Sequence, residues 1–462
     1  METKLTCYGG VGSVTGANFL LEIAAAKAGQ AGKKYLVDCG LEQGSREASE
    51  HNRKDFEYNP SEISALFVTH AHIDHTGLIP KLVKNGFKGD IYSTPATRKI
   101  VGLLLEDAAK INREKEYPLY GADDVAKALS LWKTIPYHEK RDFDGFSIEL
   151  FDAGHVLGSS MIKFTVRSLA SDAKKPDFKI LFSGDLGNCP SPLLNNTEVV
   201  PGVDYLLMES VYGDRNHEGV DERVSKLKQI VADAIARGGT LLIPVFSLDR
   251  TQTILYELDN FFESGELPSV PVFLDSPLAI KITNVYEEWE KSFNADVQKE
   301  LKRGDQIFNF SRLRETMLGM ESRKIREIKG PKIILAGSGM STGGRITHHE
   351  AEYLPDPNTT VLFVGYQAPG TLGRQIAEGV KEVTIDNEQI TVRAKVEKIN
   401  GFSAHADSDT LVKFVEPNKD NLKKVFVAMG EPGSSQFLAQ RLRDELEVDA
   451  IVPEANKTYL LN

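Results

Sequence analysis

Cysteine is scarce in this sequence, and long apolar runs are missing from it. Its three cysteines, Cys7, Cys39 and Cys189, are scattered without CxxC spacing, which argues against a disulfide framework and against a cysteine-based zinc site. No apolar run approaches the ~18 residues that a membrane span requires, and the N-terminus lacks the apolar segment of a secretory signal. We therefore expect a cytoplasmic protein with no membrane partner.

Positive charge is also in short supply. The chain carries a formal net charge of −11 at pH 7, so any nucleic-acid site must concentrate positive charge locally, which bound metal ions could do. Its 462 residues exceed the roughly 250–300 at which single cores stop growing. Two domains are therefore expected.

The pattern of apolar residues changes twice along the chain. Short strands joined by turn-rich loops dominate up to about residue 210, and helices then alternate with apolar strands. Such alternation predicts a parallel sheet with helices on its faces. Short strands return from residue 395. We therefore expect a first domain made of residues 1–208 and 395–462, with a second domain, residues 209–394, inserted in it.

Three other segments in the first domain have a recognisable composition. The charged stretch from Arg98 to about Lys133 is expected to be helical, with Pro118 and Gly121 interrupting it. Residues 24–34 and 170–177 are rich in alanine and lysine. We expect both to be solvated hairpin tips.

The stretch "THAHIDHTG", residues 69–77, packs four potential metal ligands into six positions: His70, His72, Asp74 and His75. It follows the predicted strand "ALFVTH", and a helix is expected to begin near Thr76, so a loop at a strand end should hold the four residues. In extended backbone His70 and His72 project to the same side, whereas the turn into the helix directs Asp74 and His75 elsewhere. This arrangement suits two adjacent metal ions better than one.

Further ligands are expected at other strand ends. His155 in "DAGHVLGSS" and Asp185 in "LFSGDLGN" each follow a predicted strand and stand beside glycines that let the backbone approach closely. A lone histidine is usually structural, but three histidines and an aspartate in six positions are typical of a metal site.

Nine motifs, in this order, resemble one family. "VDCG", "HAHIDH", "GH" and "SGD" resemble the metallo-β-lactamase superfamily, whose fold is an αββα sandwich. "MESVYGDRNH", "PVFSLDRTQ", "AGSGMSTGG", "GYQAPGTLG" and "GFSAHAD" resemble the β-CASP nucleases within it, especially the short prokaryotic relatives of the mRNA 3′-end cleavage endonuclease. The resemblance covers essentially the whole chain and implies an inserted β-CASP domain.

The resemblance also implies a site with two zinc ions. His70, His72 and His155 would hold the first ion, Asp74 and His75 would contribute to the second, and Asp185 would bridge them. Asp38 in "VDCG" would be a carboxylate that orients the histidine cluster. His405 would donate a proton to the leaving oxygen, and Glu209 would orient His405. The residues expected to act in catalysis are thus Asp38, Asp74, Glu209 and His405.

Substrate phosphates are expected to meet basic side chains and the glycine-rich turn "GSGMSTGG", whose backbone N–H groups near a helix N-terminus favour anions. The candidates for these contacts are Arg215, His217, Arg250, Ser338, Gly339 and Arg374. For each basic residue, a surface ion pair is an equally good interpretation. His348 and His349, at the start of a predicted helix, are expected to be solvated, and His51 and His138 are expected on the surface.

The sequence departs from the family pattern at two positions. Where ribonuclease members usually end a late strand with "VHGE", this chain has "VAMGEP", which puts Met429 in place of a second-zinc histidine. A thioether is a poor ligand for zinc. We therefore expect the second zinc position to be only partly occupied. The other departure is Asp249 in "SLDR", where family members often carry glycine.

The resemblance implies a zinc-dependent phosphodiesterase that hydrolyses RNA, mainly as an endoribonuclease. It is also compatible with 5′ exonuclease activity. Single-stranded RNA is the expected partner. Two alternatives stay open because of Met429: a DNA-processing member, since the branch that acts on DNA also lacks this histidine, and a catalytically weak RNA-binding or scaffold member. A small-molecule hydrolase would lack the inserted domain. The sequence also leaves a homodimer open.

Overall fold

Parallel and antiparallel strands form two sheets in the larger part of the molecule. The structure is a computed structural model that describes residues 3–23, 32–44, 46–113, 118–167, 177–368 and 370–461. The chain divides into two compact units, a larger one of residues 1–216 and 405–462 and a smaller one of residues 217–404. Most of each expected hairpin tip, at 24–34 and at 170–177, lies outside the described residues.

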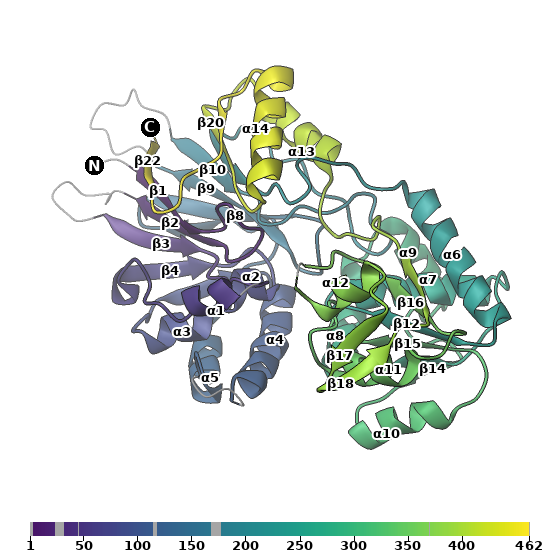
Figure 1. Ribbon diagram of the computed structural model, residues 1–462. Helices are drawn as coiled ribbons and strands as arrows, with labels where there is room; N and C mark the ends of the chain where they lie inside the picture. Colours follow the sequence, from purple (N-terminus) through teal and green to yellow (C-terminus); the bar gives the residue numbers. More distant parts are fainter. Residues whose placement is uncertain are drawn as a thin grey trace. The chain divides into compact units, whose positions relative to one another are not determined.

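The larger unit contains two seven-stranded sheets (Figure 1). In spatial order, the first consists of β22 (Thr458–Leu461), β1 (Thr3–Gly9), β2 (Asn18–Ile23), β3 (Lys33–Val37), β4 (Ile63–Phe67), β5 (Asp90–Ser93) and β6 (Trp132–Thr134). The second consists of β21 (Ala450–Ile451), β20 (Lys424–Val427), β11 (Tyr205–Met208), β10 (Phe178–Phe182), β9 (Ser160–Val166), β8 (Phe146–Asp152) and β7 (Arg141–Phe143). The first and last strands of the chain, β1 and β22, pair antiparallel.

Aromatic side chains from both sheets form the core between them. Phe19 and Phe67 of the first sheet are buried in one cluster with Phe146, Phe164 and Phe182 of the second. The ring centroids of Phe67 and Phe164 lie 5.2 Å apart in an edge-to-face arrangement. Burial of each such ring stabilises the fold by roughly 1.5–3 kcal/mol, so these residues hold the two sheets together.

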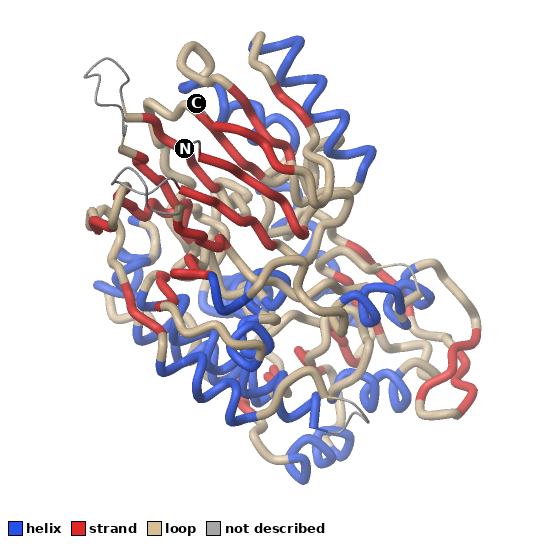
Figure 2. The backbone as a smooth tube through the Cα atoms, turned by 90° about the vertical axis from the view of Figure 1, so that its left-hand side faces the viewer, coloured by secondary structure: helices blue, strands red, loops and turns tan. Residues whose placement is uncertain are grey.

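Helices cover the outer faces of the sheets. Figure 2 shows the strands of the larger unit in red with blue helices beside them. They are α1 (Arg46–His51), α2 (Ile73–Thr76), α3 (Ile79–Lys84), α4 (Pro95–Arg113), α5 (Ala122–Ser130), α13 (Ser408–Val415) and α14 (Pro432–Leu446). Leu411 of α13 and Leu438 of α14 pack in one cluster with Leu206 and Val425 of the second sheet. The larger unit is therefore the expected αββα sandwich.

The smaller unit contains a six-stranded sheet in which every pairing is parallel. Its order is β14 (Leu313–Glu315), β13 (Val272–Leu274), β15 (Lys332–Ala336), β12 (Thr240–Pro244), β16 (Thr360–Phe363) and β19 (Lys395–Lys398). A two-stranded sheet joins β17 (Glu382–Ile385) to β18 (Glu388–Thr391). The helices are α6 (Val220–Ala236), α7 (Arg250–Glu263), α8 (Pro277–Glu288), α9 (Ala295–Lys302), α10 (Gly319–Lys324), α11 (Arg345–Tyr353) and α12 (Leu372–Ala377).

Three details differ from the sequence-based expectations. Helix α5 ends at Ser130, and Lys133 lies in β6, because it pairs with Tyr92 of β5. Residues 395–404 belong to the smaller unit, because β19 extends its sheet by parallel pairing with β16. The smaller unit begins at His217 instead of residue 209.

Within the described part of the chain, every helix falls short of the length and apolarity of a membrane-spanning segment.

Candidate metal centre

Strand ends of the larger unit bring the potential ligands together. Asp38 follows β3, His70 lies three residues beyond the end of β4, and Asp185 lies in the loop after β10. Strands β3 and β4 are parallel, with Val37 opposite Phe67, so the chain leaves both strands at the same edge of the sheet. The backbone N–H of Asp38 donates to the Phe67 carbonyl at 2.9 Å, which extends this pairing into the loop.

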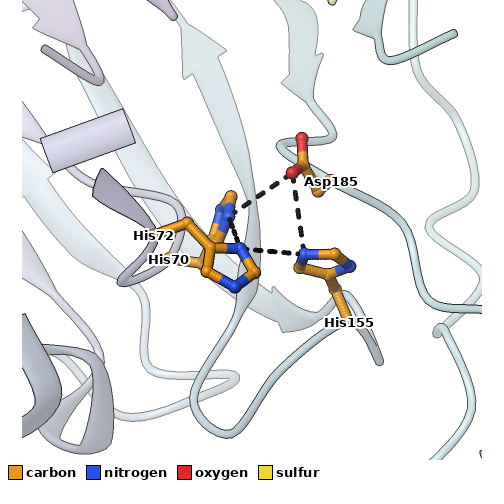
Figure 3. A group of neighbouring side chains, drawn as sticks. All are labelled: His70, His72, His155 and Asp185. Atoms are coloured by element: carbon orange, nitrogen blue, oxygen red, sulfur yellow. Dashed lines mark hydrogen bonds and ion pairs between the residues drawn. The ribbon is translucent and has the colours of Figure 1, made fainter. Parts of the chain in front are cut away.

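The first group of ligands consists of His70, His72, His155 and Asp185. Figure 3 shows the three imidazole rings close to the Asp185 carboxylate. His72 Nδ1 lies 3.1 Å from His70 Nε2 and 3.2 Å from His155 Nε2. Asp185 Oδ2 lies 3.5 Å from His70 Nε2 and 3.6 Å from His155 Nε2. With bonds of about 2.0–2.1 Å, ligand atoms of a tetrahedral zinc ion lie about 3.3–3.4 Å apart. The group therefore has the dimensions of a zinc site.

The electrostatics of this group also suit a cation. Burial, followed by the charge of neighbouring His75, holds the pKa of His70 well below its ordinary value, so the ring stays neutral as a metal ligand must. His75 Nε2 and Asp185 Oδ1 are buried and have no hydrogen-bond partner among the described residues. They lie 3.3 Å apart. A metal ion would satisfy both atoms.

The second group consists of Asp74, His75 and Asp185. Asp74 Oδ2 lies 4.0 Å from His75 Nε2. The expectation that one loop holds all four residues of the 69–77 stretch is wrong for Asp74 and His75, which lie inside the short helix α2. The helix begins at Ile73 instead of near Thr76. The His75 ring nevertheless lies beside His70, with ring centroids 4.1 Å apart. Asp185 is the residue common to both groups.

Asp38 positions His75 through a direct hydrogen bond. His75 Nδ1 lies 2.7 Å from Asp38 Oδ2, so the other ring nitrogen, Nε2, faces Asp185. The backbone N–H and the hydroxyl of Thr69 each donate to Asp38 at 2.8 Å. Burial alone would lower the pKa of His75, but Asp185 and Asp38 raise it well above its ordinary value, so a metal ion at Nε2 would have to displace a proton from this ring. The sequence reasoning missed Thr69, although its place directly before His70 was a usable signal.

A histidine and a glutamate from distant parts of the chain meet beside this cluster. His405 Nδ1 lies 3.2 Å from Glu209 Oε2 and 3.8 Å from Asp185 Oδ2. Glu209 is buried, and its Oε1 accepts the backbone N–H of Leu186 at 2.6 Å. Burial alone would lower the pKa of His405, but Glu209 and Asp185 raise it to about 9. The ring therefore holds its proton near neutral pH.

Met429 lies two residues after β20, with a buried side chain. It packs in the apolar core between the sheets, and a Cβ at Gly10 would collide with its sulfur. Its backbone has a φ of +47°. Asparagine, aspartate and histidine occur there more readily than methionine. The conformation thus suits the histidine that the family usually carries.

The glycine-rich turn of the smaller unit lies between β15 and α11. The Ser338 hydroxyl accepts the backbone N–H of Thr342 at 2.9 Å, and a Cβ at Gly339 would lie 2.7 Å from the Phe246 ring. Gln367 connects this turn to Arg374: its Nε2 donates to the Gly339 carbonyl at 2.9 Å, and its own carbonyl lies 3.5 Å from Arg374. The structure therefore brings three predicted phosphate residues into one region of this unit, through a glutamine that the sequence reasoning missed.

The basic candidates also have local contacts of their own. Arg215, in the larger unit, pairs with Asp214 at 3.1 Å and stacks over the Tyr212 ring at 4.8 Å. Arg250 is buried at the first position of α7, and His217 is the first residue of the smaller unit. Arg374 forms an exposed ion pair with Glu378 at 2.6 Å.

The prediction that His349 is solvated is wrong. His348 is exposed, but His349 is buried and its Nε2 lies 2.6 Å from Asp275 Oδ2. The Asp275 carboxylate also accepts Arg345 at 2.6 Å. Burial would raise the pKa of Asp275, but these hydrogen bonds, that of His349 first, hold it below its ordinary value. Helical periodicity places neighbouring residues on different faces, and the second histidine falls on the inner one.

The departure at Asp249 has a conformational reason. Asp249 precedes α7 with a φ of +67°, in the left-handed region that glycine adopts without strain. This explains why the family often carries glycine there. Here Asp249 is the central residue of a tight turn in which the backbone N–H of Arg250 donates to the Leu248 carbonyl at 2.9 Å, a strained conformation for a residue with a side chain.

Comparisons with known proteins agree with this architecture. Family models match the chain in three places: the Metallo-beta-lactamase superfamily at residues 28–238, the Beta-Casp domain at 251–376, and the Zn-dependent metallo-hydrolase RNA specificity domain at 389–453. Among solved structures, a protein of unknown function from Enterococcus faecalis V583 aligns over 100% of both chains, with a TM-score of 0.55 and 13% identity. That likeness concerns the fold alone.

Several curated proteins are similar over most of the chain. Ribonuclease TTHA0252 of Thermus thermophilus is 35% identical over 413 residues, which cover 89% of this chain and 90% of the relative. Transcription termination factor FttA of Cenarchaeum symbiosum is 31% identical, over 100% of this chain and 71% of its own. Cleavage and polyadenylation specificity factor 73 of Drosophila melanogaster is 31% identical, over 91% of this chain and 59% of its own.

The matched domains agree with the geometry of the site. A superfamily of metallo-hydrolases matches the segment that contains His70, His72, His155 and Asp185, and these four side chains converge as potential ligands. The larger unit therefore contains a metal-binding site. The chain belongs to the β-CASP nucleases of the metallo-β-lactamase superfamily.

Proposed function

We propose that the chain is a zinc-dependent phosphodiesterase that hydrolyses single-stranded RNA, mainly as an endoribonuclease. The proposal is compatible with an additional 5′ exonuclease activity. The observation that carries the proposal is that two arrangements meet at Asp185: a cluster of three histidine ligands, His70, His72 and His155, and a protonated His405 held by Glu209. Similarity to a ribonuclease and to an RNA specificity domain supports RNA as the substrate.

The ligand chemistry supports zinc in two adjacent positions. His70, His72, His155 and Asp185 would hold the first ion, while Asp74, His75 and the shared Asp185 would hold the second. When bound, zinc supplies Lewis acidity, which activates a water nucleophile and offsets negative charge on the phosphodiester. Among the described residues the second group has three protein ligands, and one of them, Asp185, is shared with the first group. Since Met429 stands where family members supply a further histidine, we propose that zinc occupies the second position only in part.

Side chains and backbone of the protein would carry out proton transfer, ligand orientation and phosphate binding. His405 is protonated at neutral pH and would give its proton to the leaving oxygen, while Glu209 holds the ring through Nδ1. Asp38 keeps His75 in the orientation that directs Nε2 toward Asp185. The turn at Ser338 and Gly339, with Arg374, would contact substrate phosphates, and we propose the same role for Arg215, His217 and Arg250.

We also propose that the protein is cytoplasmic, in agreement with its three free cysteines, Cys7, Cys39 and Cys189.

The test combines zinc stoichiometry with cleavage of RNA and DNA. The purified full-length protein, measured by inductively coupled plasma mass spectrometry, should hold between one and two zinc ions per chain. Single-stranded RNA labelled at the 5′ or the 3′ end should be cut internally, and DNA of the same sequence should be cut poorly. His51→Ala, which removes an exposed histidine beside Glu42, is the matched control for ligand variants.

DNA processing is the second candidate, because Met429 replaces a histidine that the DNA-acting branch also lacks. Faster cleavage of DNA than of RNA would favour it. RNA binding with zinc bound but no cleavage of either polymer would instead indicate a scaffold member.

A further inference from the structure

A separate group of carboxylates lies in the smaller unit, far along the sequence from the histidine cluster. Asp259 and Glu263 stand four residues apart on α7, so they share one face of the helix. Asp305 lies in the loop after α9. One carboxylate oxygen from each of the three residues lies within 4.8 Å of the others. Unlike the other groups of potential ligands among the described residues, this one does not include Asp185.

Two of these carboxylates contain buried oxygens that lack a partner within the described part of the chain. Asp259 is only 2% exposed. Its Oδ1, and Oδ1 of Asp305, are buried and have no hydrogen-bond partner among the described residues. A buried carboxylate oxygen left in this state is costly unless a hydrogen bond or a metal ion compensates it. The two oxygens therefore indicate a ligand that the protein itself does not supply.

The local charge points to a cation. Asp259 and Glu263 lie in the last turns of α7, where the helix dipole is negative, and the last turn has no basic residue. Burial, then the charges of Glu263, Asp305 and Glu300, raises the pKa of Asp259 to about 7. Near neutral pH the group must therefore hold a proton or a positive ion to be stable.

We propose that Asp259, Glu263 and Asp305 bind a hard divalent cation, with Ca²⁺ as the best match. All three donors are carboxylate oxygens, which Ca²⁺ prefers, and no histidine or cysteine belongs to the group. Two oxygens on opposite sides of Ca²⁺ lie about 4.6–5.2 Å apart, since each bond is about 2.3–2.6 Å, so oxygens within 4.8 Å can share one ion. Glu263 is exposed, which lets water complete the coordination.

Such an ion would join the loop after α9 to the C-terminal end of α7. The site is independent of the proposed nuclease chemistry. Its role is to fix the conformation of this part of the smaller unit, so stability is the quantity to measure.

The experiment uses full-length protein already saturated with zinc, near neutral pH, and adds CaCl₂ or MgCl₂. At a Ca²⁺ concentration about 100-fold above its Kd, the unfolding midpoint should rise by about 7 °C if the smaller unit unfolds by itself, and by about 3 °C if the whole chain unfolds together. In Asp305→Asn, which removes one ligand from a half-buried position, the rise should disappear. Asp296→Asn is the matched control, because it removes an exposed carboxylate of α9 that pairs with Lys299, and it should keep the full rise. Isothermal titration of Ca²⁺ into the same three proteins measures binding directly.

Three outcomes distinguish the possibilities. A larger rise with Mg²⁺ that Asp305→Asn abolishes supports the site and assigns it to the smaller ion. An equal rise in wild type and Asp305→Asn overturns the proposal, because the ion then binds elsewhere. No rise with either cation at about 10 mM also overturns it, since even weak protein sites for Ca²⁺ are filled at that concentration, and a shared proton must then satisfy Asp259.

Discussion

The two units use their strand ends differently. In the larger unit, the loops after β4, β8 and β10 carry histidines and aspartates, and other side chains fix their orientation, as Asp38 and Thr69 do around His75. In the smaller unit, the loop after β15 is glycine-rich, and its shape depends on backbone conformation and on Gln367. Gly344 shows this dependence: its φ is +78°, and a Cβ there would lie 2.5 Å from the Gly337 carbonyl.

This difference matches the tasks that we propose for the two regions. Metal binding and proton transfer require titratable side chains held within a few tenths of an ångström, which buried hydrogen bonds provide. Phosphate contacts require close approach of the backbone, which glycine permits. Variants of the histidine and aspartate cluster in the larger unit should therefore abolish hydrolysis, and variants around the glycine-rich turn of the smaller unit should weaken substrate binding or stability.

The largest effect is expected for His72→Ala. Its Nδ1 faces both His70 and His155, so the substitution removes a ligand from the centre of the first group. RNA hydrolysis should fall to background and bound zinc should decrease, while the circular dichroism spectrum stays unchanged. Full activity in this variant would refute the metal assignment, and His51→Ala should behave like wild type.

His405→Ala is expected to reduce kcat by about 10²–10⁴-fold without loss of zinc, the usual range for removal of a general acid. Because Glu209 acts through His405, adding Glu209→Gln should reduce the rate little further. Single-turnover rates of the two single variants and the double variant measure this coupling. Losses that multiply would show that the two residues act independently.

A smaller effect, on binding, is expected for Arg374→Ala. If Arg374 contacts a substrate phosphate, KM for RNA should rise by about 3–10-fold with kcat nearly unchanged. Arg167→Ala, which breaks an exposed ion pair with Asp142 in the larger unit, is the control for loss of surface charge. A change in kcat with constant KM would contradict the division of tasks between the units.

Met429→His should raise zinc content toward two ions per chain and increase the rate most at limiting zinc. The left-handed backbone at this position accepts histidine. Since Met429 packs in the core, a loss of about 1–3 kcal/mol in stability is expected as well. If wild type already binds two ions tightly and the variant alters neither zinc content nor rate, another ligand must complete the second site.

The last prediction concerns pH and the residues under the glycine-rich turn. Glu350 is fully buried, accepts the Ser341 hydroxyl at 2.5 Å, and has a pKa that burial raises to about 7 from 4.5. The folded state therefore holds a proton that the unfolded state releases, and stability decreases as pH rises from about 4.5 to 7.

Glu350→Gln should remove this dependence and raise the free energy of unfolding above pH 7 by at most roughly 3 kcal/mol relative to wild type. Urea titrations at acidic and alkaline pH measure the difference. The exposed neighbour gives the control Glu352→Gln, which should keep the wild-type pH dependence.

Much of the fold was accessible from the sequence, because its signals are local. The alternation of helices with apolar strands after residue 210 predicts the parallel sheet that β12, β13, β15 and β16 form. The clustering of His70, His72, Asp74 and His75 within six positions predicts a metal site, since few other functions need those residue types so close together. Motif order then identifies the family without reference to packing.

Tertiary structure decided which distant residues meet and which side chains are buried. His405 and Glu209 are 196 positions apart in the sequence and become partners only because the C-terminal segment joins the loop after β10, where Ala406 pairs with Leu186. His349 is buried against Asp275 although its neighbour His348 is exposed. Asp305 joins Asp259 from another element. Local sequence patterns describe one element at a time, whereas charge compensation, burial and ligand geometry depend on several elements at once.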